Sequence, residues 1–175
     1  MKNKNGFTLV ELIVVIILIA IVSSYAASRY FGQSSFSAYT YQEATVSLIR
    51  QIQVNRMHSN LSFDDPQCHE DKAAFSLNVV GNCFGSSASC SSVTGNNQRP
   101  SSYDLAKSDY IFEEDVNFTM TPTSSTCAEL GIEFDLLGNP ITSNDSGVLI
   151  SINAKGSTAF VCINPQGYVS EGTCL

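Results

Sequence analysis

GFTLVELIVVIILIAIV, residues 6–22, is an apolar run that carries a single acid, Glu11. The run extends over residues 7–27, which are enough to cross the roughly 30 Å hydrocarbon core of a bilayer as a helix. Lys2 and Lys4 precede it, which favours a cytoplasmic N-terminus and an exported remainder. An acid deep inside a membrane helix costs about 2.5–3.5 kcal/mol on insertion scales, so Glu11 needs an explanation.

Three interpretations of this segment compete. An ordinary secretory signal peptide also has a basic start, and residues 24–26 could serve as its cleavage site. Neither a signal peptide nor a simple membrane anchor gives Glu11 a purpose. If residues 1–6 are removed, however, Phe7 gains an α-ammonium group about one helical turn from Glu11, and staggered neighbouring copies can pair the two charges. Pairing makes an intramembrane charge much less costly, so we interpret Glu11 as an assembly and register device.

Residues 2–22, KNKNGFTLVELIVVIILIAIV, closely resemble the N-terminus of type IV pilins and pseudopilins with a class III-type methylation motif. That pattern is a short basic leader, a glycine, and then Phe-Thr-Leu, a hydrophobic residue and Glu. The resemblance implies a leader of residues 1–6, cleavage by a prepilin peptidase between Gly6 and Phe7, and N-methylation of Phe7. It also implies that Phe7 and Glu11 take part in subunit assembly.

The helix is expected to continue beyond the apolar run, through residues 28–60. No proline precedes Pro66, and apolar or small residues recur there at helical spacing. The stripe that they form should pack on a sheet of the globular domain; it comprises Ala38, Tyr41, Thr45, Leu48 and Ile52. Arg50 and Arg56 lie off this stripe, and we expect both to be solvated. Many members of the family have a proline kink in this helix, and here Gly32 is the expected site of any bend.

Residues 61–175 are predicted to form an exported, β-rich domain, which makes the fold class α+β. Short β-prone runs alternate with Gly, Asn, Ser and Pro, as in an antiparallel sheet with tight turns. Hairpin connections are predicted at residues 154–157 (AKGS) and 165–167 (PQG). Residues 81–102 are rich in glycine and serine, which predicts a long surface loop.

All the cysteines follow the apolar run, and an even set in an exported domain predicts disulfides. The candidates are Cys68, Cys83, Cys90, Cys127, Cys162 and Cys174. The turn before the C-terminus favours a bond between Cys162 and Cys174, and a further disulfide should pin the loop at residues 81–102. Pairing Cys68 with Cys83 and Cys90 with Cys127 completes one of the fifteen possible schemes.

The composition argues against several functions. Nine Lys and Arg face sixteen Asp and Glu, which disfavours a phosphate-binding surface, so no nucleic-acid partner is predicted. His58 and His69 have no catalytic partner at motif spacing, and we expect no enzymatic activity, no catalytic residue and no cofactor.

Residues 64–71 (DDPQCHED) are interpreted as a solvated turn rather than a metal site. Residues 113–117 (EEDVN) are interpreted as a charged sheet edge.

The downstream sequence is similar to the C-terminal domain of minor pilins and pseudopilins of the GspH/FimT type. The similar segments are residues 47–57, 133–141, 148–163 and 164–169. Residues 28–44 and the six cysteines resemble a minor pilin of a mannose-sensitive haemagglutinin type pilus. This resemblance implies that the disulfide-closed C-terminus is a candidate contact or adhesion surface.

Together these features predict a structural subunit of a type IV pilus used in surface attachment. The long loop and the six cysteines favour a minor subunit over a major one. The prepilin would lie in the inner membrane with a periplasmic C-terminal domain, and the mature chain in the pilus at the cell surface. Its expected partners are other pilin subunits, the prepilin peptidase, the inner membrane and the assembly platform. The alternatives are a type II secretion system pseudopilin and a secreted binding protein with an ordinary signal peptide.

Overall fold

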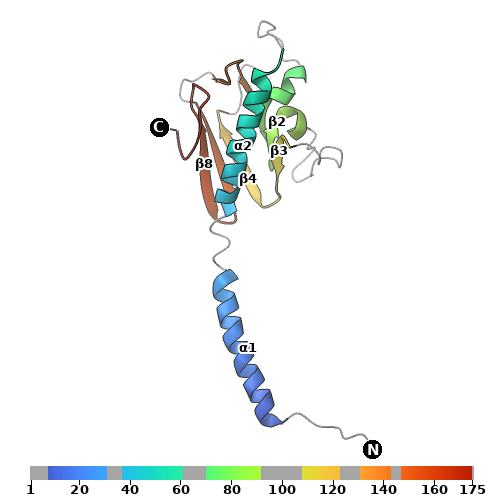
Figure 1. The fold of residues 1–175 in the computed structure, drawn as a ribbon, viewed down its shortest axis with the longest axis vertical. Coiled ribbons are helices and arrows are strands. Elements are labelled where there is room, and N and C mark those ends of the chain that lie inside the picture. Colours follow the sequence, from blue (N-terminus) through green and yellow to red (C-terminus); the bar gives the residue numbers. More distant parts are fainter. Residues whose placement is uncertain are drawn as a thin grey trace, which may run out of the picture.

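The computed structural model describes residues 8–30, 37–60, 70–91, 108–122, 131–142 and 147–174. Helix α1 (Leu9–Tyr30) stands apart from the domain that the other described residues form, as Figure 1 shows. Helix α2 (Ser37–Met57) lies across the strands of that domain. This layout confirms the predicted α+β class. Residues 31–36, with the predicted bend at Gly32, lie outside the described residues, so a continuous helix stays a prediction.

The described strands form two antiparallel sheets, which confirms the predicted antiparallel pairing. The first has the order β3-β2-β1-β5-β6, and the second has the order β4-β7-β8-β9. The strands are β1 (Ser76–Val80), β2 (Cys83–Ser86), β3 (Tyr110–Phe112), β4 (Val116–Thr121), β5 (Ile132–Phe134), β6 (Pro140–Ile141), β7 (Val148–Ala154), β8 (Ser157–Ile163) and β9 (Val169–Glu171). A 3₁₀ helix, η2 (Glu70–Phe75), precedes β1, and a short helix, α3 (Ser87–Cys90), follows β2.

Both predicted hairpin turns are present. Lys155 and Gly156 connect β7 to β8 with φ of 45° and 83°, the left-handed conformation that a two-residue hairpin turn requires. Between β8 and β9 the amide of Gly167 donates to the carbonyl of Asn164 at 2.9 Å, and the amide of Asn164 donates to the carbonyl of Tyr168 at 2.9 Å. The turns therefore fix the register of this three-stranded unit.

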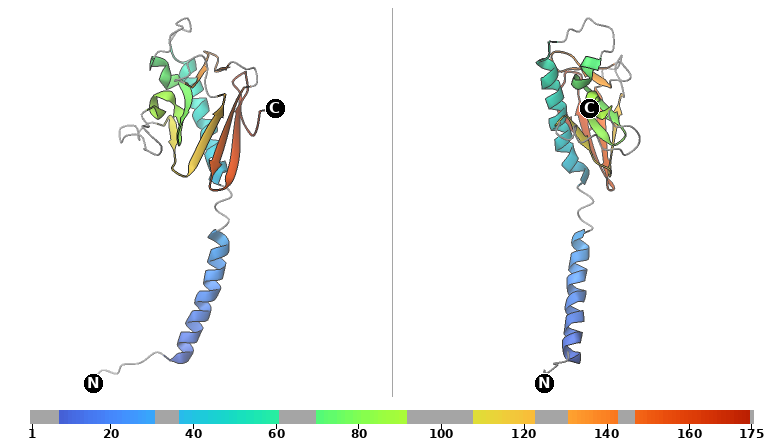
Figure 2. Two further views of the ribbon diagram at one scale, coloured as in Figure 1. Left: turned by 180° about the vertical axis from the view of Figure 1, so that it is seen from behind. Right: turned by 90° about the vertical axis from the view of Figure 1, so that its right-hand side faces the viewer.

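Helix α2 covers the sheets with the predicted stripe. Ala38, Thr45, Leu48 and Ile52 are buried, as predicted, and Tyr41 is partly buried. Alternate residues of the strands meet the helix because successive side chains in a strand point to opposite faces. The largest fully buried side chains include Phe84, Phe134, Ile49, Ile52, Leu77, Ile132, Ile150, Ile152 and Ile163. The core therefore lies between α2 and both sheets, and the two views of Figure 2 show the helix on one side of the strands.

The prediction that Arg56 is solvated is wrong. Only 4% of Arg56 is exposed, and its Nε donates to the carbonyl of Phe134 at 2.9 Å. One of its terminal nitrogens donates to Ser59 Oγ at 2.7 Å. The end of α2 lies against β5, so Arg56 gains hydrogen-bond partners there. Helical periodicity along the sequence does not predict such partners. Arg50 is exposed, as predicted, and donates to the carbonyl of Val169 at 3.2 Å.

The prediction of a surface loop over residues 81–102 is wrong for the part that the structure describes. Residues 83–90 form β2 and α3, and most of their side chains are buried. Ser86 caps α3 by accepting from the amide of Ser89 at 3.2 Å, and both hydroxyls donate to the Asp109 carboxylate. Buried polar groups are tolerated when they are hydrogen-bonded, so this serine-rich sequence can pack. Residues 92–102 lie outside the described residues.

Two disulfides are described. The predicted bond between Cys162 and Cys174 is confirmed and fastens the tail after β9 to β8. The second bond joins Cys83 to Cys90, so the scheme that paired these residues with Cys68 and Cys127 is wrong. The tight connection from β2 into α3 brings Cys83 and Cys90 together, which the sequence spacing alone did not favour. Cys68 and Cys127 lie outside the described residues.

Candidate assembly site

The first turn of α1 is organised by Thr8. Its Oγ1 accepts a hydrogen bond from the amide of Glu11 at 3.3 Å, and its carbonyl accepts one from the amide of Leu12 at 3.2 Å. Thr8 therefore occupies the N-cap position and Glu11 the third position of the helix. A Ser or Thr followed three residues later by Glu is the sequence signature of a capping box. The sequence contains this signal at Thr8 and Glu11, and it predicts the start of α1.

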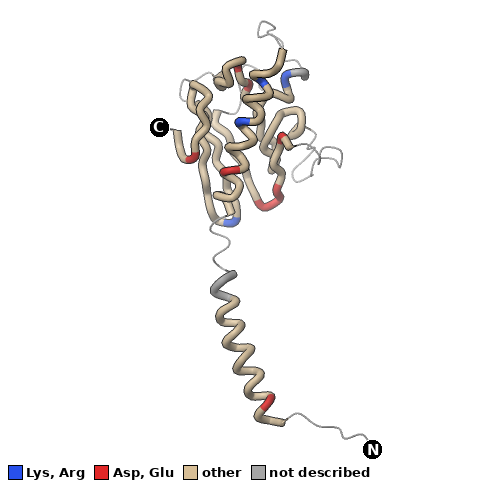
Figure 3. The backbone as a smooth tube through the Cα atoms, viewed as in Figure 1, with Lys and Arg blue, Asp and Glu red and all other residues tan. Residues whose placement is uncertain are grey.

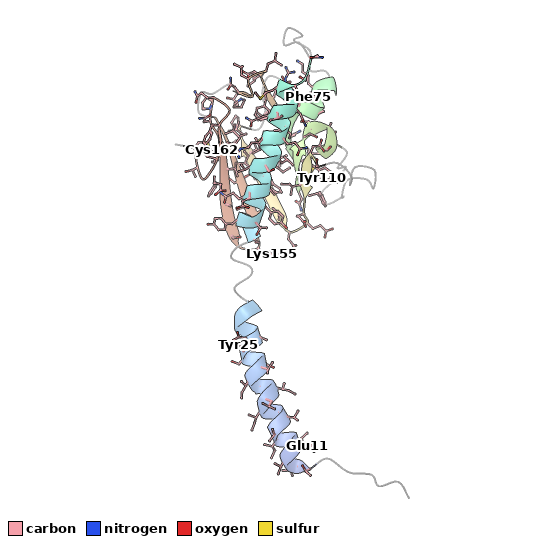
Figure 4. The ribbon with its side chains drawn as sticks, in the orientation of Figure 1. Glu11, Tyr25, Phe75, Tyr110, Lys155 and Cys162 are labelled. Carbon is pink, nitrogen blue, oxygen red and sulfur yellow. A yellow bond between two sulfur atoms is a disulfide. The ribbon has the colours of Figure 1, made fainter. Side chains whose placement is uncertain are left out.

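The position of Glu11 at the start of α1 lowers the free-energy cost of placing its charge in an apolar segment. Glu11 lies in the first turn of α1, where unpaired amide groups and the helix dipole favour a negative charge. It is therefore not isolated in the middle of the apolar segment, because the helix itself offsets part of the cost of its charge. Figure 4 places Glu11 and Tyr25 towards opposite ends of α1.

The rest of α1 presents apolar side chains on every side. All described side chains from Leu9 to Ala26 are exposed, and this stretch is long and apolar enough to cross a membrane. Glu11 is its only charged residue, as Figure 3 shows. An exposed apolar surface of this size requires lipid or other apolar helices around it. The segment is therefore suited to a membrane anchor and to a helical bundle.

Gly6 and Phe7, the predicted cleavage and methylation residues, lie outside the described residues. The structure describes Glu11, the other predicted assembly residue, but not the group that would pair with it. Cleavage, methylation and charge pairing therefore stay predictions.

The described part of the domain has few residues arranged for metal binding or catalysis. No group of three or more His, Cys, Asp or Glu residues that could hold a metal ion occurs among the described residues. His58 is exposed at the end of α2, whereas His69 lies outside the described residues. Most of the acidic segment 64–71 is also outside them. The buried hydroxyls of Ser86 and Ser89 meet Asp109, an arrangement that anchors α3 to the residues before β3.

The acidic residues at 113–115 form a turn between β3 and β4, and β4 begins at Val116. Both strands are edge strands of their sheets, so this segment lies at a sheet edge, as predicted. All three are exposed, and Asp115 pairs with Lys155 at 3.3 Å. Partial burial raises the pKa of Tyr41 on α2, and the negative charge of Glu113 raises it further. This turn thus places a concentration of negative charge beside the first half of α2.

Comparison with known proteins agrees with the geometry at the N-terminus. Residues 1–27 match the family model of the prokaryotic N-terminal methylation motif. No curated protein and no solved structure matches the chain. The methylation motif, the exposed apolar helix and the antiparallel β domain that follows together support a type IV pilin or pseudopilin that is anchored in a membrane before assembly.

Proposed function

We propose that this chain is a minor subunit of a type IV pilus. The observation that carries the proposal is the exposed apolar helix α1, which overlaps the methylation motif over residues 9–27 and has one acid in its first turn. In the inner membrane, lipid covers this helix. In the filament, the equivalent helices of neighbouring subunits cover it, and the domain lies outside them.

The maturation steps follow from the motif. A prepilin peptidase removes residues 1–6 and methylates the new N-terminus at Phe7. The α-ammonium group of one subunit then pairs with the Glu11 carboxylate of its neighbour. This pairing acts together with the Thr8 cap, because the helix dipole and an external cation both stabilise the same carboxylate.

A minor role is supported by the elaboration of the domain. Strand β2 and helix α3 add a disulfide-closed unit to the first sheet, and a second disulfide closes the C-terminal tail. A subunit that is repeated along the whole filament needs only a compact domain. The resemblance to minor pilins of the GspH/FimT and mannose-sensitive haemagglutinin types agrees with this role, and the tail closed by Cys162 and Cys174 is the proposed adhesion surface. The chain's partners would be other pilins, the peptidase and the assembly platform.

The experiment is mass spectrometry of the chain purified from membranes and from sheared surface filaments. We expect both forms to begin at an N-methylated Phe7. A chain that begins near Ala27 would instead establish a secreted protein with an ordinary signal peptide. The second candidate, a type II secretion pseudopilin, is favoured by the same motif. Deletion of the gene separates the two, because loss of surface filaments is expected for a pilin and loss of protein export for a pseudopilin.

A further inference from the structure

The exposed apolar side chains of the domain gather at one end. Apart from Tyr39, the large hydrophobic residues that are exposed in the described part of the domain belong to two turns and to the last turns of α2. We call this group the distal patch; it comprises Val54, Met57, Leu136, Leu137 and Tyr168. Leu137 and Tyr168 are 75% and 64% exposed, so most of each residue is open to solvent.

Gln53 joins the three parts of the distal patch. Its Nε2 donates to the carbonyls of Gly138 and Gly167, both at 2.8 Å. A Cβ added to Gly167 would lie 2.4 Å from the Gly138 carbonyl oxygen, so the turns that carry Leu137 and Tyr168 are in direct contact. The turn at residues 135–139 is itself closed, because Asp135 accepts from the amides of residues 137 and 139 at 2.8 Å each. The patch is therefore a fixed surface.

The distal patch lies at the end of the domain that is farthest from α1. The first residues of α2 bond to the turn between β7 and β8, through Ser37 to Ala154 at 2.9 Å and through Ala38 to Ser157 at 3.0 Å. In Figure 4, Lys155 of that turn lies at the end that faces α1. The patch is at the other end of α2, so in a membrane-anchored chain it points away from the bilayer, and lipid does not cover it.

A second copy of this chain does not complement the distal patch. The end of the domain that faces α1 carries Glu113, Glu114 and Asp115, all exposed, with Lys155 as the cation that pairs with Asp115. Head-to-tail stacking of two copies would press these carboxylates against apolar side chains, and burying an unpaired carboxylate is costly. Contact between two distal patches would require antiparallel chains, which a shared membrane or a parallel bundle of α1 helices prevents.

We infer that the distal patch docks the membrane-facing end of a different subunit of the same filament, one whose end is apolar rather than acidic. The inference rests on the proposed function, because a parallel filament is what places the base of one subunit above the top of another. It goes beyond that function by giving this chain a heterotypic neighbour on its distal side. The acidic turn at residues 113–115 then acts against self-association.

The test uses photo-cross-linking of the full chain in cells that assemble the filament. Tyr168 is replaced by benzoyl-phenylalanine, and the same replacement of the exposed Tyr39 at the opposite end is the matched control. We expect irradiation to join position 168 to another protein that itself carries an N-terminal methylation motif, identified by mass spectrometry. Leu137→Asp should lower the yield about tenfold, since burying one leucine contributes roughly that factor, whereas Leu137→Met should retain it.

Several results would overturn the inference. These are an adduct between two copies of this chain, an adduct with lipid or with a protein that lacks the motif, a yield that Leu137→Asp leaves unchanged, and the absence of any adduct at position 168. The proposed function fails separately, if the unmodified chain is missing from sheared filaments. An adduct with another motif-bearing subunit in the membrane fraction would then still support the docking surface.

Discussion

Helices α1 and α2 have nearly the same length, 22 and 21 residues, yet they are stabilised in opposite ways. No residue from Leu9 to Ala26 of α1 is buried, whereas α2 buries eight residues against the strands. Helix α2 is also the more polar of the two, and its buried set includes Gln42, Gln53 and Arg56. The chain therefore buries its polar helix by itself and leaves its apolar helix exposed, a surface that suits lipid or other apolar helices.

The largest expected effect contrasts one isoleucine from each helix. Ile52→Ala should destabilise the domain by about 2–5 kcal/mol, because Ile52 is fully buried and the change leaves a cavity. Ile17→Ala removes the same atoms from an exposed position of α1 and should leave the unfolding of the domain unchanged. Urea unfolding of the full chain in detergent measures both. Equal losses from the two variants would show that α1 packs on the domain.

The disulfide between Cys162 and Cys174 is expected to make the next largest contribution to the stability of the domain. Replacing Cys162 and Cys174 together by serine opens a loop with a sequence separation of 12 residues, and should cost the domain about 3 kcal/mol in the chain-entropy model. The tail that follows β9 should then lose amide protection in hydrogen exchange, while α1 keeps its helical content. A tail that stays protected in the double variant would show that the disulfide is dispensable.

A pair of arginines tests how α2 holds its buried polar groups. Arg56→Ala removes the donor to the Phe134 carbonyl and should cost about 1–3 kcal/mol, the usual penalty for an unsatisfied buried group. Arg50→Ala, at an exposed position of the same helix, should change the free energy of unfolding by less than about 0.5 kcal/mol. Denaturant midpoints of the two variants make the comparison. A larger loss from Arg50→Ala would contradict the assigned roles.

The smallest effect concerns the start of α1. Thr8→Val removes the hydroxyl that caps the Glu11 amide and should destabilise the first turn by about 1 kcal/mol, whereas Thr8→Ser should retain the cap. Amide hydrogen exchange at Glu11, measured in micelles, reports this change directly. Unaltered protection in the valine variant would mean that the hydroxyl does not cap the helix.

The sequence predicted the features that depend on local pattern. The apolar run predicted α1, and the spacing of Ala38, Thr45 and Ile52 predicted the buried face of α2. The turn residues Lys155 and Gly156 predicted a hairpin. Each of these signals is set by neighbours along the chain, at the period of a helix or at a tight turn. The cap at Thr8 belongs to the same class, and its motif could have been recognised.

The features that were missed depend on partners distant in sequence. Ser86 and Ser89 are buried because Asp109, about twenty residues on, accepts their hydrogen bonds. Arg56 is buried because its acceptor is the Phe134 carbonyl, 78 residues away. A polar composition predicts exposure unless such an acceptor is known, and composition carries no information about it. The distal patch could not be predicted for the same reason, since Gln53 joins turns that only the fold brings together.

The central claim is that α1 acquires its partners only on assembly, through the charge of Glu11. The most direct test is Glu11→Gln, which removes the charge while keeping the length of the side chain, with the amounts of the chain in membranes and in sheared filaments measured by quantitative immunoblotting. The account predicts an unchanged amount in the membrane and a fall of at least about tenfold in the filament, as expected when a buried ion pair loses one partner. Equal incorporation of the variant and the original chain into filaments would contradict it.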